Sequence, residues 1–446
     1  MEILTQPPRA ALLRESSTGE VMNMNLRKMY SVGRCLLMIG GAFWVSVACA
    51  SAQTADATSI NNKVMAGYQG WFRTPGDVSG NTSWAHWFTA APSQSTEDFD
   101  SWPDLTGMPT SAQVAAPGFK FPDGNAATLY SGQNATAVLT HFQWMQAAGI
   151  DGVWVSEFES HLPGGSSASD YPNVLNTLNN IRAAATSTGR TWALLYDTSG
   201  QSATSLAAGI ETQWENMVNS GYTSDARYLH MNGLPVVMLF GFFPNDSNHL
   251  LGDPTVGNPL ISFFHTAGKY QAYVVGSGAW NWTTGSSAYQ DELFTLNAYI
   301  PWNVGHTTIA SDGNIVSNDT TWPSDYSTFA SHGVKYIPLV NPGTCAAGPP
   351  LTTCAAPRRN GYYLWEQFVD ASNIGVGDIN TVFVAMYDEV NEGTAIMPIT
   401  NTPPSQSPPF LISPGDPGDW YEELVVTGEG YLKDGKAVPT SIPIHP

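Results

Sequence analysis

The stretch 381–398, TVFVAMYDEVNEGTAIMP, contains the pattern that decides the predicted fold. Residues 382–386 form an uncharged apolar run, and three carboxylates follow it, at Asp388, Glu389 and Glu392. An apolar run of this kind is typical of a strand that is buried on both faces. Carboxylates clustered at the end of such a strand are typical of the functional face of a parallel α/β barrel. The stretch therefore predicts a barrel strand that ends in a candidate site.

The spacing of Glu389 and Glu392 indicates the chemistry of that site. On a helical turn, residues three apart have Cβ atoms roughly 5–6 Å apart on one side. Two carboxyl groups at about that distance suit the cleavage of glycosidic bonds, in which one group is protonated and the other ionised. One alternative is an acidic, solvated start of a helix. Metal binding is a third possibility, but the chain has no HExxH motif and no histidine close by.

Seven other apolar runs precede this one, and most are separated by segments with helical spacing. The strand predictions are 64–72, 150–155, 191–196, 235–240, 271–275, 296–300, 335–340 and 381–387. The helix predictions are 135–148, 171–188, 205–218, 259–267, 326–332 and 359–371. The alternation predicts a (β/α)8 TIM barrel with long loops at the C-terminal face of the strands. We expect one domain, 53–446, with a proline-rich tail that begins at Asn401 and wraps the surface.

The composition favours a protein that handles sugars. The formal net charge of −20 argues against nucleic acid and anionic membranes as partners. Only 12% of the residues are charged, whereas the chain has 15 Trp, 18 Tyr and 18 Phe. Aromatic rings stack on the apolar faces of sugar rings, and amides and hydroxyls bind their OH groups. We therefore expect a carbohydrate partner, no cofactor and a monomeric protein.

The first 52 residues have the pattern of a signal peptide, with a possible upstream extension. Three basic residues, Arg27, Lys28 and Arg34, come before an apolar run at 35–48, and Ala-Ser-Ala follows at 50–52. Cleavage there would leave a secreted or periplasmic protein with no membrane contact. A lipid-modified Cys49 is the alternative.

Two cysteines remain after such cleavage, Cys345 and Cys354, in a loop rich in glycine and proline. In an exported chain we expect them to form a structural disulfide. The basic residues that follow, Arg358 and Arg359, are expected to be solvated.

Further residues that follow predicted strands are candidates to bind substrate. Each has a structural alternative: core packing for the aromatic residues, helix capping for Asp197, and pairing with Arg182 for Glu157. These candidates are Tyr68, Trp87, Glu157, Asp197, Trp302, His306 and Asp388.

With these residues laid out, the chain resembles the glycoside hydrolase family 71/99-like group, which is related to the family 99 endo-α-mannanases and endomannosidases. The resemblance spans nearly the whole mature chain. It is carried by VMAGYQGWF at 64–72, GIDGVWV at 149–155, LYDTSG at 195–200, NGLPVV at 232–237, IPWNVG at 300–305, NGYYLWEQ at 360–367 and YDEVNEGTAI at 387–396.

The resemblance implies roles for the two glutamates. Family 99 has a Glu-x-x-Glu motif followed by Gly, usually with Trp-His between the acids. Here Val390 and Asn391 occupy the two middle positions. The family pattern implies that Glu392 is the acid/base for the glycosidic oxygen. It also implies that Glu389 removes the proton of the sugar 2-OH, which gives an anhydro-sugar and net retention.

Two other classes of function compete with a hydrolase. One is a carbohydrate-binding barrel without turnover, although binding alone does not need a pair of acids. The other is a calcium-stabilised structural protein, suggested by Asp312, Asn314 and Asp319, whose spacing lacks the EF-hand pattern.

Overall fold

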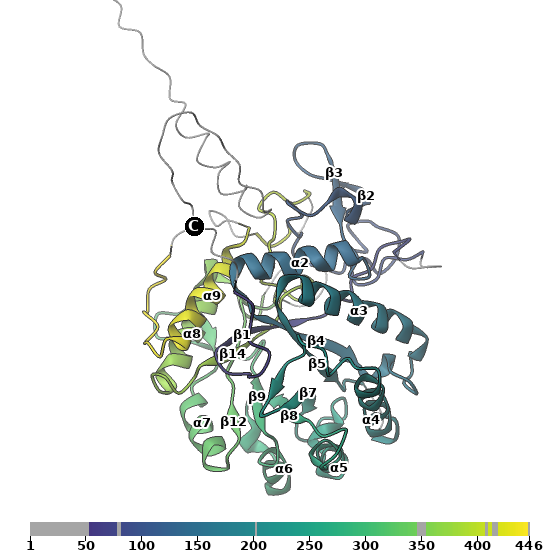
Figure 1. Cartoon of the computed structure of the whole chain (residues 1–446). Coiled ribbons are helices and arrows are strands. Elements are labelled where there is room, and N and C mark those ends of the chain that lie inside the picture. The colour runs from purple at the N-terminus through teal and green to yellow at the C-terminus, as the bar shows by residue number, and fades with distance from the viewer. Residues whose placement is uncertain are drawn as a thin grey trace, which may run out of the picture. The chain divides into compact units, whose positions relative to one another are not determined.

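Eight parallel strands form the centre of the fold (Figure 1). The structure is a computed structural model that describes residues 53–77, 82–200, 203–345, 354–405, 409–412 and 418–444, without the side chains of 203–205. The predicted signal peptide, residues 1–52, lies outside the described residues and remains a prediction.

The central strands run in the order in which they occur in the chain. They are β1 Lys63–Tyr68, β4 Gly152–Phe158, β5 Thr191–Asp197, β7 Leu234–Phe242, β8 Tyr273–Ala279, β9 Ala298–Trp302, β12 Lys335–Tyr336 with β13 Leu339–Val340, and β14 Thr381–Val384. Each pairs in parallel with its neighbour, and β1 pairs with β14. The last strand is shorter than expected, since it ends at Val384 and not at Tyr387.

The seventh strand closes the ring although it is interrupted. Its first half, β12, pairs with β9, and its second half, β13, pairs with β14. Between the halves, Ile337 N–H donates to Tyr299 O, and Pro338 O accepts from Phe383 N–H. Proline has no N–H to donate, so the strand changes partners where a donor is missing. The predicted (β/α)8 barrel is therefore confirmed.

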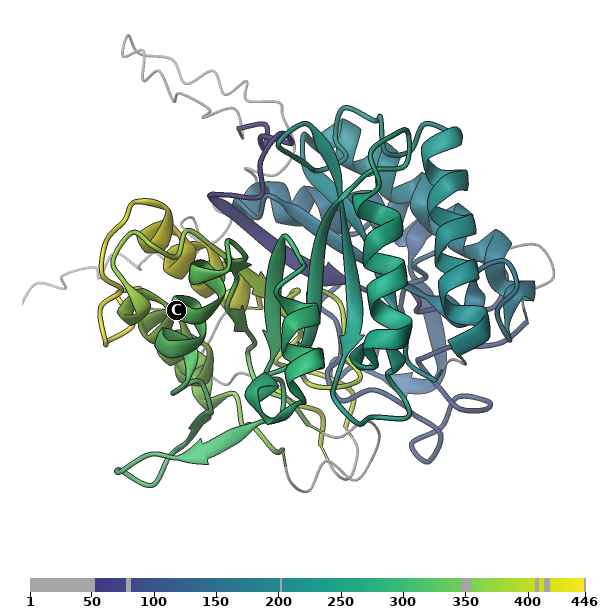
Figure 2. The ribbon, with the colours of Figure 1, turned by 90° about the horizontal axis from the view of Figure 1, so that it is seen from below.

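A helix follows each of the eight strands and covers the outside of the barrel (Figure 2). The helices are α2 Ala135–Ala148, α3 Tyr171–Thr188, α4 Ala203–Asn219, α5 Pro254–His265, α6 Ser287–Leu293, α7 Trp322–Ser331, α8 Tyr362–Ile374 and α9 Trp420–Lys433. The sequence analysis missed α6 and α9. The tail was predicted only to wrap the surface, but its α9 packs against β1, β14 and α8 and so completes the ring.

Short strands and 3-10 turns lie in the loops that connect the barrel elements. They are the strands β2 Val114–Lys120, β3 Ala126–Leu129, β6 His230–Met231, β10 Thr307–Ile309 and β11 Ile315–Ser317, and the 3-10 turns η1 Thr110–Ala112, η2 Glu159–His161, η3 Ala168–Asp170, η4 Leu250–Gly252, η5 Trp282–Thr284 and η6 Arg359–Gly361. The long loop after β1 contains the β2–β3 hairpin. In Figure 2 the green β10–β11 hairpin projects away from the barrel. No helix among the described residues has both the length and the apolar character needed to cross a membrane.

Candidate active site

The three carboxylates of the final strand lie in a buried turn, residues 388–394, which we call the acidic turn. The chain reaches it from β14 alongside β1, because Tyr387 N–H donates to Gly67 O at 2.7 Å. On the other side, Met386 N–H donates to Thr394 O at 3.0 Å, which closes the turn at its base. The turn is therefore fixed at the C-terminal end of the barrel, where barrel enzymes place their active sites.

Glu389 is held by two side chains. Gln69 Nε2 donates to one of its oxygens at 2.8 Å, and Thr394 Oγ1 donates to the other at 2.7 Å. Burial, together with the charge of neighbouring Glu392, raises the pKa of Glu389 to about 8, although the two donors act in the opposite direction. The carboxyl group is thus oriented and titrates above the usual range of a glutamate.

Glu392 is half-buried, and no described residue donates a hydrogen bond to its carboxyl group. Its pKa is raised by burial and then by the charge of Asp197. The charge of Glu392 in turn raises the pKa of Glu389. The structure thus brings Glu392 within electrostatic reach of both Glu389 and Asp197, although Asp197 comes from a different strand.

Asp388 has a structural role. Its two oxygens accept hydrogen bonds from the backbone N–H groups of Gln69 at 2.7 Å and Gly70 at 2.8 Å. The side chain is fully buried, and burial raises its pKa to about 6. Asp388 joins the end of the last strand to the end of the first, so we place it behind the site and not in contact with substrate.

Two aromatic candidates also lie behind the site. Tyr68 and Trp87 are both fully buried. The Tyr68 hydroxyl lies 3.0 Å from His141 Nδ1, and Trp87 Nε1 donates to Tyr130 O at 2.9 Å. Neither ring has a free face for a sugar, so the structural alternative of core packing describes both.

The candidates at the ends of β4 and β5 face the open end of the barrel. Burial raises the pKa of Glu157 well above its ordinary value, and raises that of Asp197 despite two hydrogen bonds from Ser199. The alternative pairing of Glu157 with Arg182 is wrong, because Arg182 pairs with Asp225 at 2.7 Å.

Trp302 is the last residue of β9 and is half-buried, whereas His306 lies in the loop that follows and is exposed. The Trp302 ring packs edge-on against Phe240, with centroids 4.9 Å apart, and His306 lies 5.1 Å from the ring of Trp280. Burial lowers the pKa of His306, so it is neutral at pH 7 and has one N–H to donate. Both remain candidates for contact with substrate.

A pocket lies beside the acidic turn, at the ends of β1 and β4 and the start of α3. It is lined by Gln69, Gly70, Trp71, Arg73, Ala85, His86, Gln133, Ser156, Glu157, Phe158, His161, Asp170, Asn173, Val174 and Thr177. The two glutamates of the turn do not line it, but Gln69 connects it to Glu389. Three buried polar atoms of its lining, Gln69 Oε1, Trp71 Nε1 and Arg73 Nε, have no partner among the described residues.

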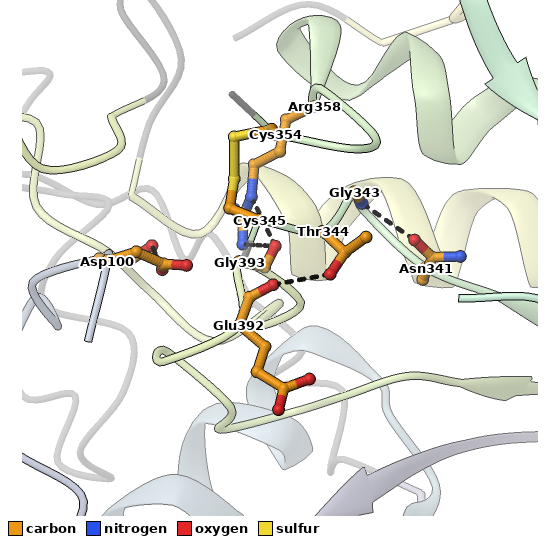
Figure 3. Close-up of a disulfide and its surroundings, with 10 residues drawn as sticks. Asp100, Asn341, Gly343, Thr344, Cys345, Cys354, Arg358, Glu392 and Gly393 are labelled. Atoms are coloured by element: carbon orange, nitrogen blue, oxygen red, sulfur yellow. Dashed lines mark hydrogen bonds between the residues drawn. A yellow bond between two sulfur atoms is a disulfide. The ribbon is translucent and has the colours of Figure 1, made fainter. Parts of the chain in front are cut away.

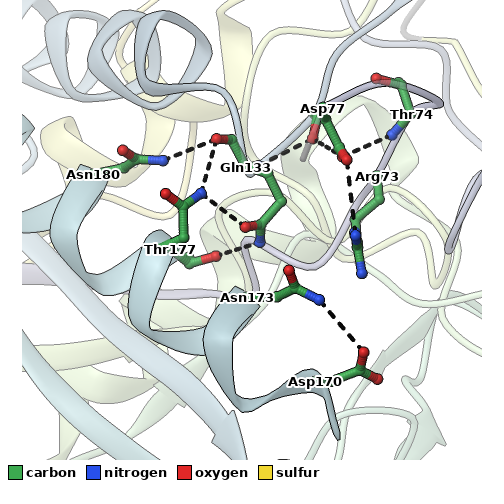
Figure 4. Close-up of polar contacts among 10 residues, drawn as sticks. Arg73, Thr74, Asp77, Gln133, Asp170, Asn173, Thr177 and Asn180 are labelled. Carbon is green, nitrogen blue, oxygen red and sulfur yellow. Dashed lines mark hydrogen bonds and ion pairs between the residues drawn. The ribbon is translucent and has the colours of Figure 1, made fainter. Parts of the chain in front are cut away.

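The polar wall of this pocket is rigidly built (Figure 4). Gln133 Nε2 donates to Thr177 Oγ1 at 2.7 Å, and Gln133 Oε1 accepts from Asn176 at 2.8 Å. Arg73 and Asp77 pair at 3.8 Å on the opposite side of Gln133. Amide and hydroxyl groups fixed in this way suit the binding of a polyhydroxylated ligand.

The predicted disulfide between Cys345 and Cys354 is present, with Cα atoms 4.0 Å apart. It lies against the acidic turn, and the Glu392 carboxyl group points away from it (Figure 3). Arg358, which was expected to be solvated, is buried and donates to Gly393 O at 3.0 Å. That expectation was wrong because the guanidinium satisfies backbone carbonyls that have no other donor in the turn.

The described residues contain no cluster of three or more His, Cys, Asp or Glu side chains arranged to hold a metal ion. Of the residues suggested for calcium, Asp312 bonds Asn314 locally, at 2.7 Å through the side chains. Asp319 is instead buried beside Asp370, and burial raises its pKa to about 8.

Comparison with solved structures shows which known fold this barrel is similar to. The chain is similar to the GH99 endo-alpha-mannosidase from Bacteroides thetaiotaomicron, with a TM-score of 0.60 and 15% sequence identity over 84% of this chain and 99% of that one. This likeness shows that the two chains share the same barrel fold. A second structure of that enzyme, in complex with bis-tris-propane, gives a TM-score of 0.59 at the same identity and coverage. No family model and no curated protein matches the sequence.

Proposed function

We propose that this protein is an exported glycoside hydrolase that cleaves a poly- or oligosaccharide with retention, using Glu389 and Glu392. One observation carries the proposal. Two carboxyl groups three residues apart, one buried and one half-buried, lie in the turn after the last barrel strand, and each has its pKa raised by burial while the charge of Glu392 raises the pKa of Glu389. Two such groups cannot both be ionised easily, so the pair holds one proton near neutral pH.

The hydrogen bonds around the pair support one assignment of that proton. Both oxygens of Glu389 accept hydrogen bonds, one of them from a group that can only donate, the Gln69 amide N–H. Such donors favour the charged form of Glu389. Glu392 has no donor among the described residues, and we propose that it carries the shared proton in the reaction, against the effect of burial, which raises the pKa of Glu389 to about 8. These are the states that an acid and its partner base need.

The reaction follows from these states and from the family 99 pattern. Glu392 gives its proton to the glycosidic oxygen as the bond from that oxygen to the anomeric carbon breaks. Glu389 takes the proton of the 2-OH, whose oxygen attacks the anomeric carbon and closes an anhydro-sugar. Water then opens the anhydro-ring at the anomeric carbon. It gives a proton to Glu392, and Glu389 returns its proton to the 2-oxygen. Two inversions give net retention.

The neighbouring pocket supports a sugar as the substrate. Its free polar atoms include an amide oxygen, an indole N–H and a guanidinium N–H, which match the donors and acceptors of sugar hydroxyls. Its aromatic wall stacks His86 on Trp71, with centroids 4.1 Å apart. Fixed polar groups beside an acid pair are typical of substrate pockets.

The first experiment is a screen of the purified mature protein on defined α- and β-linked glycans, with the products separated by chromatography. Proton NMR of the first anomer formed then gives the stereochemistry, and retention is expected. Inversion would contradict the anhydro-sugar route. Binding of glycans without any product would favour the alternative, a carbohydrate-binding barrel without turnover.

The two acids are separated by their substitutions to glutamine. Glu392→Gln is expected to retain more activity on aryl glycosides with good leaving groups than on natural glycans, because such groups need no proton. Glu389→Gln is expected to lose activity on both kinds of substrate. Equal losses in both variants on both kinds of substrate would contradict the assigned roles. Export is tested by N-terminal sequencing of the protein outside the cytoplasm, which should begin near Gln53.

A further inference from the structure

We propose that Arg358 and the Cys345–Cys354 disulfide form one positioning unit for Glu392, holding the main chain of the acidic turn so that its carboxyl group faces the substrate. The inference rests on the proposed hydrolase function. It concerns residues that do not touch substrate and act only through Glu392.

The need for such a unit comes from the difference between the two acids. The Glu389 side chain is held directly, by Gln69 and Thr394. The Glu392 side chain receives no hydrogen bond from any described residue, so the position of its Cα and Cβ, which the backbone sets, limits where its carboxyl group can reach. Any freedom in that backbone therefore moves the carboxyl group of Glu392 more than that of Glu389.

The backbone carbonyls of the turn are bound by donors from the disulfide segment. Cys345 N–H donates to Glu392 O at 2.9 Å, and Thr344 Oγ1 donates to the same oxygen at 3.0 Å (Figure 3). Arg358 donates from Nε and Nη2 to Gly393 O, at 3.2 and 3.0 Å, and from Nη2 to Ala395 O. The carbonyl groups of Glu392, Gly393 and Ala395 thus all accept hydrogen bonds from this one segment.

The disulfide makes these donors a single unit. Thr344 and Ala356 exchange two backbone hydrogen bonds, of 2.9 and 3.1 Å, and the bridge from Cys345 to Cys354 closes this ladder. Arg358 follows two residues after Ala356. A crosslink across so short a loop limits the separation of its two sides even when the hydrogen bonds open.

The fit between this unit and the turn is close. Gly393 has φ of 67°, and a Cβ added there would lie 3.0 Å from Cys345 N and 3.2 Å from its sulfur. The far side of the Arg358 guanidinium lies 4.4 Å from the ring centre of Tyr421 on α9. The unit is therefore anchored to the barrel wall and not only to the turn.

Three titratable groups interact with Glu392 or Arg358 in this region. Glu389 and Asp197 interact with Glu392, while Asp100 is buried and interacts with both Arg358 and Glu392. Burial raises the pKa of Asp100 to about 7, and the Arg358 charge acts to lower it. The loss of Arg358 therefore removes a positive charge from the acid cluster as well as the hydrogen bonds.

The matched pair for the test is Arg358→Ala against Arg359→Ala. Arg359 is the next residue and pairs with Glu366 at 2.7 Å, away from the turn. For Arg358→Ala we expect kcat on glycans with poor leaving groups to fall roughly tenfold to hundredfold. A loss of this size is expected because the turn loses hydrogen bonds from a charged donor. KM and the rate on an activated aryl glycoside should change little. Arg359→Ala should leave both rates unchanged.

Three further variants complete the test. Cys345→Ser with Cys354→Ser should show the same dependence on the leaving group, and the conservative Arg358→Lys should recover part of the rate. Thr344→Val, which removes one hydroxyl donor without changing the shape, should give the same pattern more weakly. Equal losses on both kinds of substrate, or a similar loss in Arg359→Ala, would overturn the proposal.

Hydrogen exchange of peptides from 386–397, followed by mass spectrometry, provides a readout that does not need activity. Faster exchange in Arg358→Ala and in the double cysteine variant, but not in Arg359→Ala, is expected. Unchanged exchange would overturn the positioning unit. If the wild type hydrolyses no glycan, the proposed hydrolase function fails instead, and exchange alone then decides whether the unit holds the turn.

Discussion

Gln69 donates a hydrogen bond of 2.8 Å to Glu389, although 320 positions separate the two residues in the chain. The contact exists because β1 and β14 are neighbours in the closed barrel, so that the chain leaving the first strand meets the chain leaving the last. Gln69 also lines the adjacent pocket, where its Oε1 has no partner among the described residues. One side chain therefore links the candidate base to the candidate sugar pocket.

Replacing Gln69 with leucine should lower kcat/KM roughly tenfold to hundredfold, because a hydrogen bond to a charged group is worth about 1.5–3 kcal/mol. The acidic limb of the pH–rate profile, on which activity rises as Glu389 ionises, should also move to higher pH, since Glu389 loses a donor that stabilises its carboxylate. Steady-state kinetics between pH 4 and pH 9 measure both effects. Gln146→Leu is the control, because Gln146 donates to Thr188 O on the outside of the barrel. A normal profile in Gln69→Leu would show that the contact is unimportant.

Glu422 on α9 predicts a dependence of stability on pH. It is fully buried, accepts a hydrogen bond of 2.9 Å from Tyr387, and has its pKa raised to about 8 by burial. Because the folded state holds this proton more tightly than the unfolded state, Glu422 favours folding most below its ordinary pKa of 4.5. That stability is lost as pH rises toward 8, at about 1.4 kcal/mol for each pKa unit.

Glu422→Gln should therefore reduce the fall in melting temperature of the protein between pH 5 and pH 8. A glutamine oxygen still accepts from Tyr387, but the side chain no longer ionises. The control is Glu423→Gln at the next, exposed position. Thermal unfolding at several pH values makes the comparison, and parallel curves for wild type and Glu422→Gln would contradict the prediction.

Asp388→Asn should destabilise the protein by about 1–3 kcal/mol, since an amide leaves one of two backbone N–H donors without an acceptor in a buried site. The donors are those of Gln69 and Gly70. Urea unfolding measures the change in free energy of unfolding. An exposed aspartate, Asp434, pairs with Lys436 and serves as a control, where Asp434→Asn should cost under about 1 kcal/mol. Equal stability of the two variants would show that Asp388 does not tie the strands together.

The elements that the sequence predicted well are those with clear signals at their ends. Helix α2 was predicted with both of its boundaries, because Asn134 caps its start and Gly149 adopts φ of 101° at its end. Helix α9 was missed because glycine at 428 and 430 weakens its helical pattern. A Cβ at Gly428 would lie 2.5 Å from the Phe368 ring, so this glycine allows close packing against α8. A single sequence does not reveal such a packing requirement.

The same distinction applies to the candidate site. The acids were identifiable because they follow an apolar strand within a few residues. Their partners were not, since Gln69 and Arg358 contact the turn only through the closure of the barrel and the disulfide segment. Among the aromatic candidates, Tyr68 and Trp87 are buried whereas Trp302 is half-buried, and the sequence did not separate the two cases. The spacing of Tyr68 and Trp87 does not distinguish a ring at the rim from one beneath it, and the structure places both in the core.

The pairing of β1 with β14 also bears on how the molecule comes into being. Every contact between Gln69 and Glu389, or between Gly70 and Asp388, needs a segment made at the beginning of synthesis and one made near its completion. While the chain is still being synthesised, β1 has no β14 to pair with, and this edge of the barrel stays open. Contacts between such distant segments form slowly. Under the proposed function, a growing chain therefore lacks the assembled acid pair until β14 has joined β1.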